Sequence, residues 1–150
     1  LLRQVARDGL QQYLDIAEAA VSDERDPWIA FTAFMEALLD AQTVAITMSL
    51  AGMFTPDEAL YAMSMRAAEL NEAIVTRSKR RGGLRKDVVV DDLSLILEQV
   101  SSIRLGDQTR TRQLRRRYLE LCLDGLRSNG KGKLPGPPPA PDELASRWAR

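Results

Sequence analysis

The segment from Thr109 to Arg127 constrains the fold most, because its apolar residues lie on two sides of one helix. At about 100° per residue, one side carries Leu114, Tyr118, Leu121, Cys122 and Gly125, and the other carries Leu119, Leu123 and Leu126. A surface helix of a monomer needs a single apolar stripe. The second stripe predicts a second subunit, a covering C-terminal segment, or a fully buried helix at the centre of a monomer.

We favour the second subunit. In that arrangement a two-fold axis relates identical surfaces. The last two long helical segments, residues 91–104 and 109–127, then form a four-helix bundle with their copies. Gly125 suits a close approach of two helices.

The rest of the chain also reads as helix, which predicts an all-α fold. Its 150 residues suit one domain, and aromatic residues make up only 5%. Ala, Leu, Arg, Glu and Met are frequent, and all favour helices. Apolar spacing predicts the first helix over residues 1–20.

Helix boundary signals divide the middle of the chain. Asp26-Pro27 predicts an N-cap followed by a first-turn proline. That helix is expected to break near residues 43–47 and leave a short helix to Met53. The run 55–58 (Thr-Pro-Asp-Glu) predicts a capping box with Pro56 at the first helical position. Gly82-Gly83 is expected to end this third helix.

The C-terminal part reads as a separate segment. We expect a helical domain over residues 1–128 and a Pro-rich strap with a short helix over residues 129–150. Residues 128–133 suggest a flexible stretch, and residues 134–139 a polyproline-type strap. One or two helical turns are expected over residues 142–149.

Several kinds of chemistry are excluded by composition. The chain has no histidine, so Ser-His-Asp and Cys-His catalysis are ruled out. Cys122 lies on an apolar face and reads as a small core residue. Neither a Gly-rich phosphate loop nor a metal-ligand motif is present, so we expect no enzyme, cofactor or metal. The net charge of zero does not favour nucleic-acid binding by this chain itself.

The expected location is the cytoplasm. A single cysteine suits a reducing compartment. The longest uncharged stretch, residues 41–56, is shorter than the roughly 20 apolar residues of a membrane span. We therefore expect no membrane contact.

Methionine and aromatic residues in the first half of the chain suggest adaptable walls for an apolar ligand, although they also suit an ordinary core. Gln42 falls on an apolar stripe, where a buried amide needs a hydrogen-bond partner. That partner is either a structural group or a ligand, and Asn71 is a similar case. The candidate ligand-binding residues are Trp28, Phe31, Phe34, Met35, Leu38, Gln42, Met63, Leu70, Asn71 and Leu97.

Five stretches together resemble TetR-family transcriptional regulators. They are LLRQVARDGLQQYL (1–14), DPWIAFTAFMEALLDAQ (26–42), GGLRKDVVVDDLSLIL (82–97), RRYLELCLDGLR (116–127) and LPGPPPAPDEL (134–144). Their order and spacing are more specific than any one of them. Many relatives have Thr or Ser where Val90 stands, so we expect Asp91 to cap the following helix instead.

The resemblance implies a homodimer in which a small apolar effector controls binding to palindromic operator DNA, most often as a repressor. The DNA-reading helix-turn-helix head is expected before Leu1, outside this chain. The implied dimer-interface residues are Leu93, Ile96, Val100, Tyr118, Leu119, Cys122, Leu123 and Leu126. The alternative function is a helical protein–protein interaction module without a small-molecule ligand, which a tightly filled core would favour.

Overall fold

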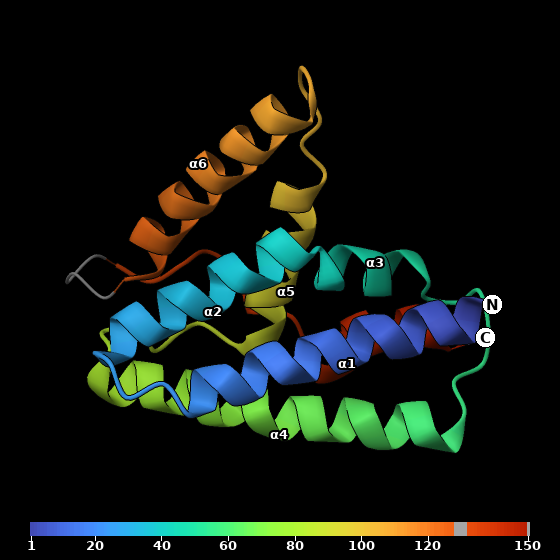
Figure 1. The fold of residues 1–150 in the computed structure, drawn as a ribbon. Coiled ribbons are helices and arrows are strands. Elements are labelled where there is room, and N and C mark those ends of the chain that lie inside the picture. The colour runs from blue at the N-terminus through green and yellow to red at the C-terminus, as the bar shows by residue number, and fades with distance from the viewer. Residues whose placement is uncertain (128–131, 150) are drawn as a thin grey trace.

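A computed structural model describes residues 1–127 and 132–149, and in this part the regular elements are all helices. Figure 1 shows their arrangement. They are α1 (Leu2–Val21), α2 (Pro27–Ala41), α3 (Thr43–Ser49), α4 (Glu58–Arg81), α5 (Val90–Ser101), α6 (Gln108–Leu126), α7 (Pro141–Ala145) and the 3₁₀ turn η1 (Ser146–Trp148). The predicted all-α fold class is confirmed.

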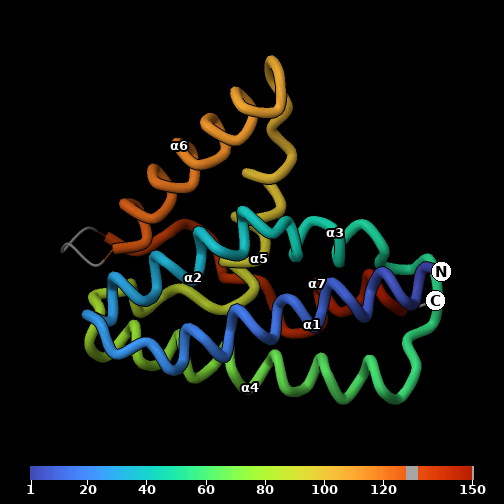
Figure 2. The backbone as a smooth tube through the Cα atoms, in the orientation of Figure 1, coloured from blue at the N-terminus to red at the C-terminus, as the bar shows by residue number. Residues whose placement is uncertain are grey.

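The helices build a layer around α1. This helix packs along α4 on one side and against α2 and α3 on the other, while α5 contacts α3, α2 and α4. The helix α6 packs against α2 and α5 and rises away from the layer, so that its first turns lie farthest from α1 (Figure 1). The tube in Figure 2 shows the C-terminal segment with α7 returning alongside α1 toward the start of the chain.

The predicted start of α2 is confirmed, and it lies against the end of α4. The Asp26 carboxylate accepts hydrogen bonds from the backbone N–H groups of Trp28 and Ile29, and Pro27 is the first helical residue. At Gly82 an added Cβ would lie 3.0–3.2 Å from backbone atoms of Ser78, Trp28 and Pro27. Only glycine allows the two helices to approach this closely. Gly83 then turns the chain with a φ of +78°.

The predicted break after α2 is also confirmed. Gln42 adopts a left-handed conformation with a φ of 57°, and its side-chain amide donates a 2.6 Å hydrogen bond to the carbonyl of Leu39. The helix that follows ends at Ser49, short of the predicted Met53. No single helix in the described part is long and apolar enough to span a membrane, and α2 and α3 reach that composition only together, across a bend of 53°.

Two other helix starts were predicted wrongly. The helix α4 begins at Glu58, and its N-cap is Asp57, whose carboxylate accepts the N–H of Leu60 at 2.9 Å. Thr55 and Pro56 therefore lie before the helix. The helix α5 begins at Val90, because the Asp92 carboxylate reaches back to the N–H of Val89 at 2.8 Å. Asp91 lies in its first turn and does not cap it, and this helix ends at Ser101 instead of at residue 104.

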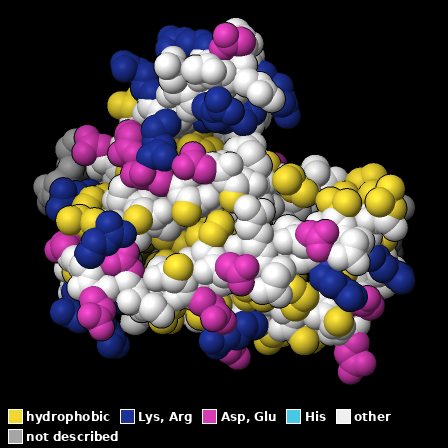
Figure 3. All heavy atoms as spheres, viewed as in Figure 1, with side chains coloured by type: hydrophobic (Ala, Val, Ile, Leu, Met, Phe, Trp, Pro, Cys, Tyr) yellow, Lys and Arg dark blue, Asp and Glu magenta, His cyan; other side chains and the backbone are white. Residues whose placement is uncertain are grey.

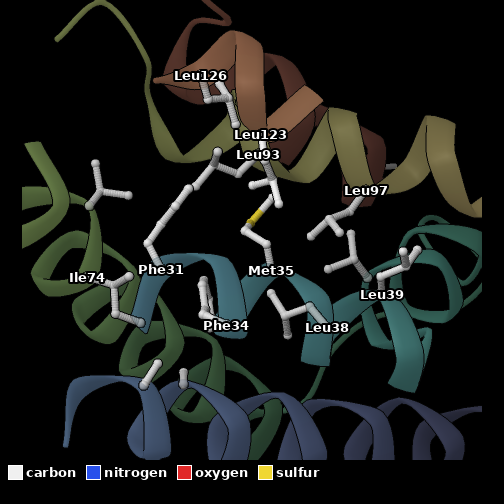
Figure 4. Packing of buried hydrophobic residues seen from close by; sticks show 14 of the residues in the cluster. Phe31, Phe34, Met35, Leu38, Leu39, Ile74, Leu93, Leu97, Leu123 and Leu126 are labelled. Atoms are coloured by element: carbon white, nitrogen blue, oxygen red, sulfur yellow. The ribbon is translucent and has the colours of Figure 1, made fainter. Parts of the chain in front are cut away.

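The core is one large cluster with a small satellite. Figure 4 shows side chains from α2, α4, α5 and α6 converging in the large cluster, where Phe31 and Met35 have no exposed surface. The satellite cluster joins Ala6, Leu50 and Leu60 and is flanked by Phe54 and Trp148.

The C-terminal segment forms the predicted helical turns over α7 and η1. The expected flexible stretch over residues 128–133 lies mostly outside the described residues.

Candidate functional site

A surface groove of about 410 Å³ lies between α1, α3, α4 and α5. Its walls are mainly apolar, with hydroxyl, amide and carboxylate groups among them. The lining residues are Leu10, Tyr13, Val44, Thr47, Met48, Ser64, Ala67, Ala68, Asn71, Glu72, Val90, Asp91, Ser94 and Pro141. A mostly apolar concavity with a few polar groups is the usual form of a small-molecule site.

A hydrogen bond lies at the inner side of the groove. The Tyr13 hydroxyl donates to Asn71 Oδ1 at 2.6 Å, and it joins α1 to α4. Burial raises the pKa of the Tyr13 phenol to about 12, although the bond to Asn71 acts in the opposite direction. The phenol therefore remains a neutral donor at physiological pH. The edge of the Tyr13 ring also packs against Phe34, with ring centroids 6.3 Å apart.

Tyr13 and Asn71 also line a small internal cavity of about 10 Å³ behind the groove. Core side chains of α2 and α5 form its far wall, among them Phe34, Met35 and Leu97. A space of this size is at the lower limit for one water molecule. The core behind the Tyr13–Asn71 bond is therefore filled, and the open volume lies on the groove side.

The predicted ligand-binding residues lie in several different places. Asn71 lines both the groove and the small cavity, and Phe34, Met35, Leu38 and Leu97 line the cavity alone. Phe31 and Leu70 are plain core residues, and Met63 is half-buried against the core. Trp28 lies apart from the groove, stacked on Phe31 beneath the Arg127 guanidinium.

Gln42 lies outside the groove, and its amide is satisfied by its own helix. It faces a second hollow of about 620 Å³, between the end of α2 and the first half of α6, with Arg104, Arg112 and Arg115 among its walls. Of the two roles left open for Gln42, the structure shows the structural hydrogen bond. Lys and Arg side chains also gather around α6 at the top of Figure 3.

Sequence reasoning missed several groove residues, including Tyr13, Val44, Thr47, Met48 and Ser94. Tyr13 carried a usable signal. It is a hydroxyl-bearing residue on the apolar stripe of the first helix, the same pattern that drew attention to Gln42. The other four are ordinary core or surface residue types, and only the packing of α3 beside α5 brings them together.

The groove carries negative charge. Glu72 and Asp91 line it, and no lysine or arginine is among the lining residues in the described part of the chain. Partial burial raises the pKa of the Asp91 carboxyl, and the neighbouring charge of Asp92 adds to this effect. An anionic ligand would therefore meet like charge here.

The two faces of α6 have different neighbours, which corrects the predicted interface. Leu119, Leu123 and Leu126 are at most 5% exposed, and Figure 4 shows Leu123 and Leu126 pointing toward α2 and α5. Tyr118 and Leu121, in contrast, are 44% and 59% exposed. The leucine face packs on the chain's own core, whereas on the other face Leu114 is also buried and Tyr118 and Leu121 are exposed.

The predicted interface is also corrected on α5. Leu93 and Val100 were predicted at the interface, but they are buried in the core, where a second subunit has no access to them. Ile96 and Cys122 are half-buried at its margin. The prediction was wrong for these buried residues because helical spacing shows that two apolar faces exist without showing which one turns inward.

An all-helical domain with a ligand-sized groove and an exposed apolar helix face has the features of a ligand-responsive regulatory domain. A family model described as "Transcriptional regulator SbtR-like, C-terminal domain" matches residues 26–128. The chain belongs to the TetR family of transcriptional regulators, as a C-terminal domain. This is a regulatory domain, for effector binding and dimerisation, in a family of non-enzymatic regulators. No curated protein matches the chain.

Proposed function

We propose that this domain binds a small, largely apolar effector in the groove between α1, α3, α4 and α5, and that binding changes the operator affinity of a dimeric regulator. The observation that carries the proposal is the groove itself, with apolar walls and the Tyr13–Asn71 pair at its inner side. Because TetR-family regulators are most often repressors, we propose that this regulator is a repressor that acts in the cytoplasm.

The groove is well placed to influence both ends of the domain. Its walls include α1, which in a full-length regulator follows the DNA-reading head, and α5, which leads into α6. A ligand that wedges between α4 and α5 favours one relative position of these helices. If that position spaces the two heads wrongly for two half-sites, the ligand shifts the population away from the DNA-binding form.

The exposed face of α6 is the proposed dimer surface. Tyr118, Leu121 and Gly125 lie on it, with Ile96 of α5 and Cys122 at its margin. An added Cβ at Gly125 would meet no atom within 4 Å, so this glycine is not required by packing within the chain. It suits the close approach of a second α6 across a two-fold axis.

The charge of the groove narrows the effector class. With Glu72 and Asp91 on its walls, the groove favours neutral or positively charged apolar molecules over anionic ones. The neutral dye N-phenylnaphthylamine is therefore expected to bind more tightly than its anionic relative anilinonaphthalene sulfonate.

The groove is tested by filling it. Ala68 lines the groove and is exposed, so Ala68→Phe adds a ring there without disturbing the core. Ala73→Phe adds the same ring to an exposed position of α4 outside the groove. In fluorescence titrations, Ala68→Phe is expected to weaken dye binding about tenfold, equivalent to about 1.4 kcal/mol. Equal binding by both variants and the parent would refute the site.

The dimer is tested separately by sedimentation velocity at micromolar concentration. The parent is expected to sediment as a dimer and Leu121→Glu as a monomer, because the new charge would be buried at the interface. Tyr61→Glu is the control, since Tyr61 is 65% exposed on α4, away from α6. A monomeric parent would contradict the proposed assembly.

A second candidate is the interaction module without a small-molecule ligand. The filled core behind the Tyr13–Asn71 bond favours it, because the predicted ligand-binding residues of α2 and α5 enclose a cavity of only about 10 Å³. Dye binding that Ala68→Phe weakens would decide against it.

A further inference from the structure

We propose that the C-terminal segment, residues 132–149, is a hinged cover over part of the groove, which swings away to widen the entrance for a ligand. The proposal rests on the groove being the ligand site. It adds a device that controls access to that site.

The segment is held first at the turn between α4 and α5. The Arg85 guanidinium donates a 2.8 Å hydrogen bond to the carbonyl of Gly132, and the Asp87 carboxylate accepts the N–H of Leu134 at 3.1 Å. Arg85 and Asp87 also form an ion pair with each other at 3.0 Å. These contacts fix where the segment starts, at the α5 end of the groove.

The middle of the segment forms part of the groove wall. Pro141, the first residue of α7, lines the groove together with residues of α1, α3, α4 and α5. Pro139 and Ala140 just before it are half-buried. The chain therefore borders the groove at this point, and a ligand in the groove would contact Pro141.

The far end of the segment is held by two side chains. Arg147 pairs with Glu98 of α5 at 2.9 Å. Trp148 packs edge-on against Phe54, with ring centroids 6.1 Å apart, beside the satellite cluster of Ala6, Leu50 and Leu60. The segment thus spans from the α4–α5 turn to the first turns of α1.

These anchors are suited to release. In contrast to α1–α6, the described residues 132–149 include no fully buried side chain. The Arg147–Glu98 pair is 41% and 30% exposed, so solvent competes for it. Consecutive prolines at 137–139 keep the chain extended, whereas Gly136 has a φ of +69° that favours glycine. The part of the segment after Gly136 is therefore suited to move as one extended unit about Gly136.

The cover is tested by thiol labelling, which needs no ligand. Ser94 lines the groove, so Ser94→Cys in a Cys122→Ser background places a single thiol in the groove wall. The neutral reagent dithiodipyridine forms a mixed disulfide with that thiol and releases thiopyridone, which absorbs light. Arg147→Glu, which breaks the far anchor, is expected to raise the labelling rate about fivefold.

Three controls make the result specific. Restoring the pair in reverse, with Arg147→Glu and Glu98→Arg together, is expected to return the rate to that of the parent. A thiol introduced by Ala73→Cys, outside the groove, is expected to label at one rate in all backgrounds. Arg66→Glu, which breaks exposed pairs of α1 and α4, should leave the Ser94→Cys rate unchanged.

Unchanged labelling of Ser94→Cys in both Arg147→Glu and Trp148→Ala would overturn the cover. This outcome is distinct from failure of the proposed function, which is read by dye titration. If the anchor variants label faster but the parent binds no dye, the cover is supported and the proposed effector site is refuted. If the parent binds dye but the labelling rate is the same in both anchor variants, the effector site is supported and the cover is refuted.

Discussion

Tyr13 of α1 donates a 2.6 Å hydrogen bond to Asn71 of α4, and this pair separates the open groove from the filled core. Burial favours the neutral phenol and holds the pKa of Tyr13 near 12, above its ordinary value of 10.0. Because the pKa is higher in the folded state, the stabilisation from this residue is complete below pH 10. It is lost as the pH rises toward 12.

The first prediction follows from this dependence of stability on pH. The free energy of unfolding of the parent, measured in urea, should fall by about 2 kcal/mol more than that of Tyr13→Phe between pH 10 and pH 12. Absorbance titration of tyrosinate should show a late-ionising residue, which Tyr13→Phe removes. Parallel pH curves for parent and variant would contradict this assignment.

The two faces of α6 should respond differently to truncation. Leu123 is 2% exposed in the core, so Leu123→Ala should lower the free energy of unfolding by about 2–5 kcal/mol. Leu121, two residues earlier, is 59% exposed. Leu121→Ala should weaken dimerisation in sedimentation experiments. The free energy of unfolding of the monomer should be nearly unchanged. Equal losses of stability would mean that both faces are buried within one chain.

Arg116 should stabilise the contact between α2 and α6 in a pH-dependent way. It pairs with Glu36 and, at 3.0 Å, with Asp40. Partial burial raises the pKa of the Glu120 carboxyl, and the hydrogen bond and charge of Glu36 raise it further. Without Arg116, three carboxylates repel one another once they are ionised.

Arg116→Gln should therefore cost about 1 kcal/mol or less at neutral pH, since the arginine is 40% exposed. The loss should shrink as the pH falls and the carboxylates gain protons. Arg117→Gln is the matched control, because Arg117 is exposed and forms no ion pair with the residues that the structure describes. A difference between parent and Arg116→Gln that is constant with pH would argue against the repulsion.

The start of α4 gives a further prediction. Asp57 caps this helix and also pairs with Arg7 of α1 at 3.2 Å. Asp57→Ala should lower stability by about 1 kcal/mol, as is usual for loss of an N-cap. Thr55→Ala should have almost no effect, because Thr55 is exposed ahead of the helix. If Thr55 were the cap, thermal unfolding would show the larger loss of stability in Thr55→Ala.

Local signals predicted the fold well where one residue type decides the geometry. Asp26-Pro27 and Gly83 fixed a helix start and a helix end, since capping and a positive φ depend on neighbouring atoms alone. The starts of α4 and α5 were predicted wrongly, because each stretch offers more than one residue that could cap the helix. At α4 the cap residue Asp57 also pairs with Arg7 of α1, a tertiary contact that the local sequence does not show.

The candidate site was predicted only in part. Asn71 was found because an amide on an apolar face needs a partner, and Tyr13 supplies it. Gln42 met the same need within its own helix, which no pattern in the sequence distinguishes. The inward face of α6 was missed because leucines on both sides look alike until α2 and α5 are placed.

Gly82 sets the contact between the end of α4 and the start of α2. Its backbone lies close to the first turn of α2, so a side chain at this position would push the two helices apart at that end. A tilt of α4 about this contact would move the far end of the helix most. Ala67, on the groove, is roughly 20 Å along the axis from it. A slight tilt at Gly82 is thereby magnified near the first turns of α1 and α4, which lie beyond the groove.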